Sequence, residues 1–257
     1  VTQNYSEAFK YFEKASEYEN PEAMKNLAIC LMEGKGTEKK PDEAIKYFNK
    51  ASESGNSEAM RYLGICHHKG DGVPQNFSKA KEYYEMAAKN CNVEAMHELG
   101  KCYYKGIGTR TNYDNALECF KKAAENNHPG ALNNLGNCYF NGNGVTQDKE
   151  KAKEYYEKAA KLKNSKAMIN LAKYYLDKNG INKENENVIN YLNDAVNEGN
   201  PEAMNMLGNF YYKGEIVNKD YSIAYNHFLN AANKGIPESI NMLGVLYLHG
   251  NYVTQNY

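Results

Sequence analysis

The sequence has no tryptophan, few prolines and no apolar run long enough to cross a membrane. Its net charge is −1, and this balance argues against a phosphate-binding surface and so against a nucleic-acid-binding protein. Hydrophobic residues make up 42% of the chain and charged residues 25%, which is enough to bury a core. The chain is therefore predicted not to insert into a membrane and not to bind nucleic acid.

What the chain does have is a period of 36 residues. The segments AMKNLAIC (23–30), AMRYLGIC (59–66) and AMHELGKC (95–102) each start 36 residues after the previous one, and the series continues to SINMLGVL (239–246). A second series, which includes EAIKYFNKAS (43–52) and KAKEYYEKAA (151–160), runs half a period away. A fixed period of this length is typical of a linear array of stacked units.

Both series have the pattern of amphipathic helices. Counted from the first residue of the AM segments, apolar or small residues fall at positions 1, 5, 8 and 9, and again at 22, 25, 26, 29 and 30. Asn-Pro-Glu at 20–22 and 200–202 should begin the first helix, and glycine at position 12 should end it. Asn4, Asp148 and Asp220 should cap the second helix, so each period predicts a helix pair.

Glycine at position 6 lies in the middle of the first helix: Gly64, Gly100, Gly136, Gly208 and Gly244. Glycine there costs about 0.5–1 kcal/mol relative to alanine, so a close approach of another helix should offset it. Alanine at position 29 recurs in all copies and is the expected partner.

The pattern predicts an all-α solenoid of 36-residue antiparallel helix pairs with about 14 helices. The expected divisions are a lone second helix (1–22), six repeats and a lone first helix (239–257), the repeats being 23–58, 59–94, 95–130, 131–166, 167–202 and 203–238. VTQNY occurs at both 1–5 and 253–257, in the same phase. Neither end has the polar capping element that solenoids normally need, which favours a fragment of a longer array, with head-to-tail self-association through the uncapped ends as the alternative.

With these motifs in view, the chain resembles the Sel-one-like repeat family, which is related to tetratricopeptide repeats. The resemblance rests on residues 131–136 (ALNNLG) through Val145 and then on 151–160 (KAKEYYEKAA), and it extends over essentially the whole chain. It implies a right-handed superhelix whose first helices line a concave face, and a role as an adaptor or scaffold without catalysis. The fifth repeat departs from the pattern, with Lys178 in place of the capping glycine and Val188 and Val196 in place of alanine, and should be irregular.

No motif points to catalysis, a metal or a cofactor. Four cysteines at position 8, hereafter the cysteine ladder, lie on the buried helix stripe one repeat apart, which is too far for disulfides; they are Cys30, Cys66, Cys102 and Cys138. Cys66, His67 and His68 are adjacent on a helix and point in different directions, so they should not bind one ion. The chain is predicted not to be an enzyme.

The concave face is the candidate site. By analogy with tetratricopeptide arrays, positions 3, 7, 10 and 11 should point into the groove, where asparagine amides can bind a peptide backbone and aromatic rings can form pockets. Basic side chains in the earlier half should suit acidic groups. The residues expected to contact a partner are Arg61, Lys101, Tyr104, Asn133, Asn137, Phe140, Asn141, Asn205, Asn209, Tyr212 and Asn241. The alternative for this face is a solvated helix surface.

The function predicted from the sequence is a protein–protein interaction scaffold that binds partner peptides or helices in its concave groove. The alternative is a structural spacer or a filament-forming segment of a longer repeat protein. Unpaired buried cysteines favour the cytoplasm. Asn4-Tyr5-Ser6 and Asn76-Phe77-Ser78 fit glycosylation sequons, which keeps the secretory lumen as the second compartment.

Overall fold

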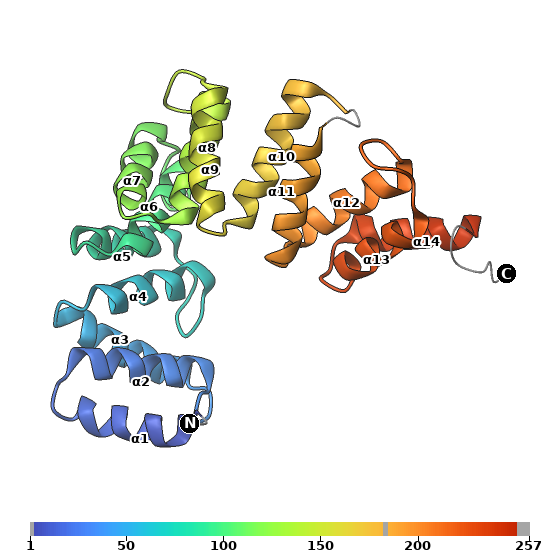
Figure 1. Ribbon diagram of the computed structural model, residues 1–257. Helices are drawn as coiled ribbons and strands as arrows, with labels where there is room; N and C mark the ends of the chain where they lie inside the picture. The colour runs from blue at the N-terminus through green and yellow to red at the C-terminus, as the bar shows by residue number, and fades with distance from the viewer. Residues whose placement is uncertain (1–2, 182–184, 251–257) are drawn as a thin grey trace. The chain divides into compact units, whose positions relative to one another are not determined.

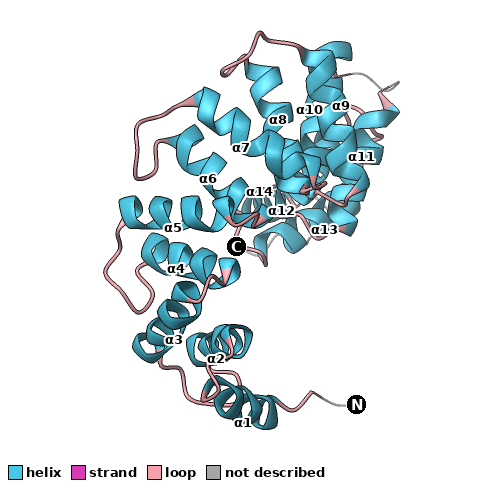
Figure 2. Ribbon diagram, turned by 90° about the vertical axis from the view of Figure 1, so that its left-hand side faces the viewer, coloured by secondary structure: helices cyan, strands magenta, loops and turns pink. Residues whose placement is uncertain are grey.

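The computed structural model describes residues 3–181 and 185–250, which form fourteen α-helices and contain no strand (Figures 1 and 2). The predicted all-α class is confirmed. The helices are α1 (Tyr5–Ser16), α2 (Pro21–Glu33), α3 (Pro41–Glu53), α4 (Ser57–Lys69), α5 (Phe77–Lys89), α6 (Val93–Lys105), α7 (Tyr113–Glu125), α8 (Pro129–Asn141), α9 (Lys149–Lys161), α10 (Ser165–Asn179), α11 (Glu186–Asn197), α12 (Pro201–Lys213), α13 (Tyr221–Ala232) and α14 (Pro237–His249). The second VTQNY copy (253–257) lies outside the described residues.

The chain divides into two compact units, Val1–Ala131 and Leu132–Tyr257. Even-numbered helices are the first helices of the repeats and odd-numbered helices are the second ones. Each of the first helices α2, α4, α6, α10 and α12 packs chiefly on the second helix that follows it. Each first helix begins two residues before the predicted start of its repeat. Within the described ranges, no helix has the length and apolar character of a membrane span.

Side-chain caps explain where the helices begin and end. Asn20 accepts a hydrogen bond from the Ala23 N–H at the start of α2, and asparagine caps α4, α6, α10 and α12 in the same way. Asn4, Asp148 and Asp220 cap second helices, as predicted. Gly34 ends α2 with a φ of 73°, a left-handed conformation that favours glycine.

Four of the glycines at position 6 lie at a close helix approach, but their nearest neighbour is an aromatic ring and not the alanine of position 29; they are Gly64, Gly100, Gly136 and Gly208, whereas a Cβ on Gly244 would meet nothing within 4 Å. A Cβ built on Gly64 would lie 2.5 Å from Cε1 of Tyr84, and one on Gly208 would lie 2.6 Å from Cε1 of Phe228. Both rings come from position 26 of the same repeat. The alanines at position 29 are nevertheless fully buried from Ala51 to Ala231.

The fifth repeat is irregular, as expected. Because Lys178 replaces the glycine that would adopt a left-handed conformation, α10 continues to Asn179 and its C-cap is Gly180. Asn185, which is only 2% exposed, donates from Nδ2 to the backbone oxygens of Tyr175 (3.1 Å) and Gly180 (3.2 Å). These bonds fasten the start of α11 to the end of α10.

Candidate protein-interaction face

The first-helix face consists of the side chains at positions 3, 7, 10 and 11 of the even-numbered helices. In the first unit, capping asparagines join α2 to α4 and α4 to α6. Asn56 Nδ2 donates to Glu22 of the preceding first helix (3.2 Å), and Asn92 Nδ2 donates to Glu58 (2.8 Å). The same asparagine side chains therefore cap one helix and bond to the previous one.

In the second unit, the predicted asparagines form an amide network. Asn170 Nδ2 donates to Asn133 Oδ1 (2.9 Å) and to Asn137 Oδ1 (3.0 Å), and the Tyr156 hydroxyl donates to the same Asn137 oxygen (2.8 Å). Asn133 is only 6% exposed. The network links α8 to α9 and α10, and it includes Asn170, at position 4, which was not among the predicted contact residues.

The remaining predicted asparagines differ in exposure. Asn205 Oδ1 accepts from Ser239 Oγ of the next first helix (2.8 Å), and Asn209 Nδ2 donates to the Asn205 backbone oxygen (2.9 Å). Asn141 and Asn241 are exposed to solvent. Some asparagine amides of this face are therefore hydrogen-bonded within the protein, and others are accessible to a ligand.

The predicted basic residues are paired with glutamates one helical turn before them. Arg61 forms two hydrogen bonds with Glu58, and Lys101 lies 2.7 Å from Glu98. Burial opposes ionisation of Glu58, but the hydrogen bonds from Arg61 and Asn92 outweigh it and lower the pKa of this carboxyl. The i,i+3 spacing of Glu58 and Arg61 in the sequence could have predicted this ion pair. Because the basic side chains are paired with glutamates, the face carries less positive charge than its lysine and arginine residues alone would suggest.

The predicted rings at position 10 are half-buried against the start of the following second helix. Tyr104 meets Tyr113 edge-on with centroids 5.4 Å apart, and Tyr212 lies 5.5 Å from Tyr221. Phe140 has the Lys149 ammonium 5.4 Å from its ring centroid. These rings are held in place, with one part of each still accessible.

Within the first unit, a histidine pair takes the place of the asparagine–glutamate link in the repeat at 95–130. The His97 and His128 rings lie 4.4 Å apart, and His128 Nδ1 accepts from the Ala131 N–H at 3.1 Å, so it caps α8. Burial lowers the pKa of His128, which favours the neutral ring that this cap requires. The only sequence signal for this exchange is that His128 stands where most other repeats have asparagine.

The cysteine ladder is buried, as predicted, and all its thiols are free. Burial raises the pKa of the Cys66, Cys102 and Cys138 thiols to about 11. His67 stacks on Tyr83 and His68 packs on Phe77, so the two imidazoles point apart. No group of three or more potential metal ligands occurs among residues 3–181 and 185–250.

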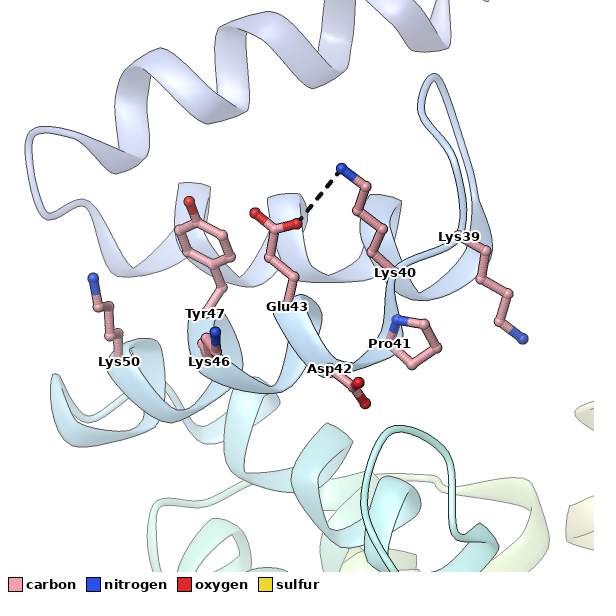
Figure 3. Close-up of a pocket in the computed structure, with 8 residues that line it drawn as sticks. All are labelled: Lys39, Lys40, Pro41, Asp42, Glu43, Lys46, Tyr47 and Lys50. Carbon is pink, nitrogen blue, oxygen red and sulfur yellow. Dashed lines mark ion pairs between the residues drawn. The ribbon is translucent and has the colours of Figure 1, made fainter.

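A hollow of about 580 Å³ lies beside α3 in the first unit (Figure 3). Figure 3 shows lysines around it, among them Lys40, whose ammonium lies 3.8 Å from Glu43. The lysines are exposed and Tyr47 is half-buried. Exposed ion pairs of this kind contribute little energy, so the hollow is not assigned as a binding site.

The family model of the Sel1 repeat matches the chain at residues 1–17, 21–56, 57–90, 93–128, 129–164, 201–236 and 237–257. The chain belongs to the Sel1 repeat family. The longest unmatched stretch, residues 165–200, covers nearly all of the irregular fifth repeat. Members of the Sel1 repeat family are generally non-enzymatic, and their repeats commonly mediate protein–protein interaction.

Two solved structures of Sel1-type proteins are similar to this Sel1 repeat chain. The protective antigen c5321 of uropathogenic Escherichia coli is 26% identical with a TM-score of 0.79, and the match covers 99% of this chain and 54% of that one. A Sel1 repeat protein from Oxalobacter formigenes is 27% identical with a TM-score of 0.79, covering 90% and 97%. This chain therefore spans about half the length of c5321. No curated protein matches it.

Proposed function

We propose that this Sel1 repeat chain is a protein–protein interaction scaffold that holds a segment of its partner along the first-helix face. The proposal rests on the hydrogen bonds that fix the polar side chains of this face from one first helix to the next. Asn133 and Asn137 are held by Asn170 before any partner arrives. Pre-ordered side chains lose less conformational entropy on binding, so each contact contributes more to affinity.

The exposed groups of the face would make the contacts. Asn141 and Asn241 offer amides that both donate and accept, which suits the backbone of an extended segment. Phe140 and Tyr212 in the second unit, and Tyr104 in the first unit, offer ring edges on the same kind of helix face. Because a hydrogen bond contributes about 0.5–1.5 kcal/mol net, the rings would supply much of the affinity.

The test is a pull-down with the full chain, identification of the captured proteins by mass spectrometry, and titration of the captured partner. Asn141→Arg combined with Asn241→Arg should weaken binding by about tenfold or more, because arginine side chains would cover the face. Asn190→Arg with Asn226→Arg is the matched control, since these exposed asparagines lie on the second helices α11 and α13. Equal affinity of the two double variants would refute the assignment of the face.

A further inference from the structure

In four repeats, a ring of the first helix stacks on a ring of the second helix. The pairs join positions 9 and 25, with centroids 5.5–5.9 Å apart and planes within 18° of parallel. They are His67–Tyr83, Tyr139–Tyr155, Tyr175–Tyr191 and Tyr211–His227. In these four repeats, the position-25 ring of the second helix covers one face of the position-9 ring.

The repeat at 95–130 has the first ring without the second. Tyr103 occupies position 9, but Cys119 occupies position 25 and is too small to cover it. A hollow of about 410 Å³, here called the Tyr103 pocket, lies at this place between α5, α6 and α7. Its lining residues include Tyr103, Cys119, Ala88, Met96 and Leu99. In the adjacent furrow between α3 and α5, by contrast, position 25 carries the ring of Tyr83.

The complete pair in the repeat at 167–202 shows how Tyr103 would accept a ring. Lys153 lies 5.8 Å from the centroid of Tyr175, and Tyr191 stacks on that same ring. Lys81 stands at the equivalent position, 5.7 Å from the centroid of Tyr103. One tyrosine ring can therefore contact a lysine ammonium and a stacked aromatic ring at the same time, so Lys81 does not prevent a second ring from stacking on Tyr103.

The Tyr103 ring is held ready for stacking. Its hydroxyl donates to Glu85 Oε1 at 2.7 Å, and Lys81 pairs with the same carboxylate at 2.8 Å. The floor beside it is apolar, and Leu99 is only 7% exposed. Aromatic pairs in this geometry attract one another beyond the effect of area burial alone.

The rim of the pocket is balanced in charge. Glu118 and Lys122 pair at 2.6 Å, which favours an uncharged occupant. The Asn115 side chain, also on the rim, can donate to and accept from a phenol hydroxyl or a peptide group. These features match an aromatic side chain attached to a polypeptide better than a charged small molecule.

We propose that the Tyr103 pocket binds a tyrosine or phenylalanine side chain of a partner polypeptide, whose ring stacks on Tyr103 in place of the ring that Cys119 does not provide. This docking site goes beyond the proposed function, because none of the α6 residues that line it, Met96, Leu99 and Tyr103, stands at a position of the first-helix face. Rigid aromatic side chains that fill such pockets commonly anchor protein interfaces.

The test uses the full chain labelled with ¹³C at the methionine methyl groups. Met96 lines the pocket, whereas Met168 and Met204 are buried in the other unit and serve as internal references. The probes are 4-methylphenol, a capped pentapeptide with a central tyrosine, and the same peptide with alanine at the centre. We expect the first two to shift the Met96 signal saturably, with a Kd on the order of 1 mM for 4-methylphenol.

Two variants fill the pocket from within. Cys119→Tyr and Cys119→His supply the ring types found at position 25 of other repeats, and each should weaken the binding of 4-methylphenol at least tenfold without lowering Tm. Cys91→Tyr, at an exposed cysteine outside the pocket, should bind as the parent does. The inference is overturned by an absence of saturable Met96 shifts, by undiminished binding in either filled variant, or by unfolding of both. It is also overturned if 4-methylphenol binds and the tyrosine peptide does not, since the occupant would then be a small aromatic molecule.

Discussion

The glycines at position 6 allow the same substitution to be tested in two opposite surroundings. In Gly64→Ala, the new methyl carbon would start 2.5 Å from Cε1 and 2.6 Å from Cδ1 of Tyr84, whereas ordinary contact begins at 3.4 Å. The ring must therefore retreat by roughly 1 Å, although Tyr84 is only 2% exposed. Overpacking of this kind costs about 1–3 kcal/mol, and the better helix propensity of alanine returns up to about 1 kcal/mol.

Gly244→Ala is the matched control, because a Cβ atom added at Gly244 would have no neighbouring atom within 4 Å. There the helix propensity acts alone and should stabilise α14 by about 0.5–1 kcal/mol. Ala28, which packs in one cluster with Phe48, shows that a repeat can be built with a methyl group at this position, so Gly64→Ala should weaken the fold rather than prevent it.

The assay is urea unfolding followed by far-ultraviolet circular dichroism, with amide hydrogen exchange to locate the change in α4 or α14. We expect a net loss of about 1–2 kcal/mol for Gly64→Ala and a gain for Gly244→Ala. Stabilisation by both substitutions would refute the argument that the ring contact selects glycine, since helix propensity would then decide at both sites.

Three further predictions concern the interior. Asn137→Ala should destabilise the second unit by about 1–3 kcal/mol, because it removes the acceptor of the buried Tyr156 hydroxyl, whereas Asn141→Ala should change stability by less than about 0.5 kcal/mol; urea titrations of the two variants measure the contrast. The burial that lowers the pKa of His128 means that the unfolded chain takes up the proton first, so stability should fall as pH drops through and below about 6.5. His128→Asn, which restores the cap found in other repeats, should flatten that part of the stability profile, and an unchanged slope in thermal melts across pH 5–8 would contradict it. With iodoacetamide at pH 8, the exposed Cys91 should be alkylated rapidly while the cysteine ladder reacts at the rate of unfolding, as peptide mass mapping would show.

The sequence was sufficient for the helices because their signals are local and repeated. Asn20 and Gly34 mark the two ends of α2 by chemistry that acts over three or four residues. The departure at Lys178 likewise predicted the irregular end of α10. The positions of the helices, their capping residues and the irregular repeat could all be predicted from the 36-residue period.

The partners of the face side chains were harder to predict, because they depend on which positions of neighbouring helices meet. Position 6 was expected to contact alanine at position 29, and Gly64 instead meets the Tyr84 ring, one helical turn away on the same second helix. Asn133 and Asn137 were expected to face a ligand, and Asn170 of the next repeat bonds to both. A period tells which residues are equivalent, and the crossing of the helices decides which of them touch.

The double use of the capping asparagines makes adjacent repeats energetically interdependent. Asn56 starts α4 and at the same time bonds to Glu22 on α2, so melting of α2 would remove one restraint from the first turn of α4. In such a chain, damage to one hairpin would spread to its neighbour before it reached more distant ones. The first unit should therefore lose structure progressively from one hairpin to the next, with each asparagine–glutamate bond between first helices marking one step.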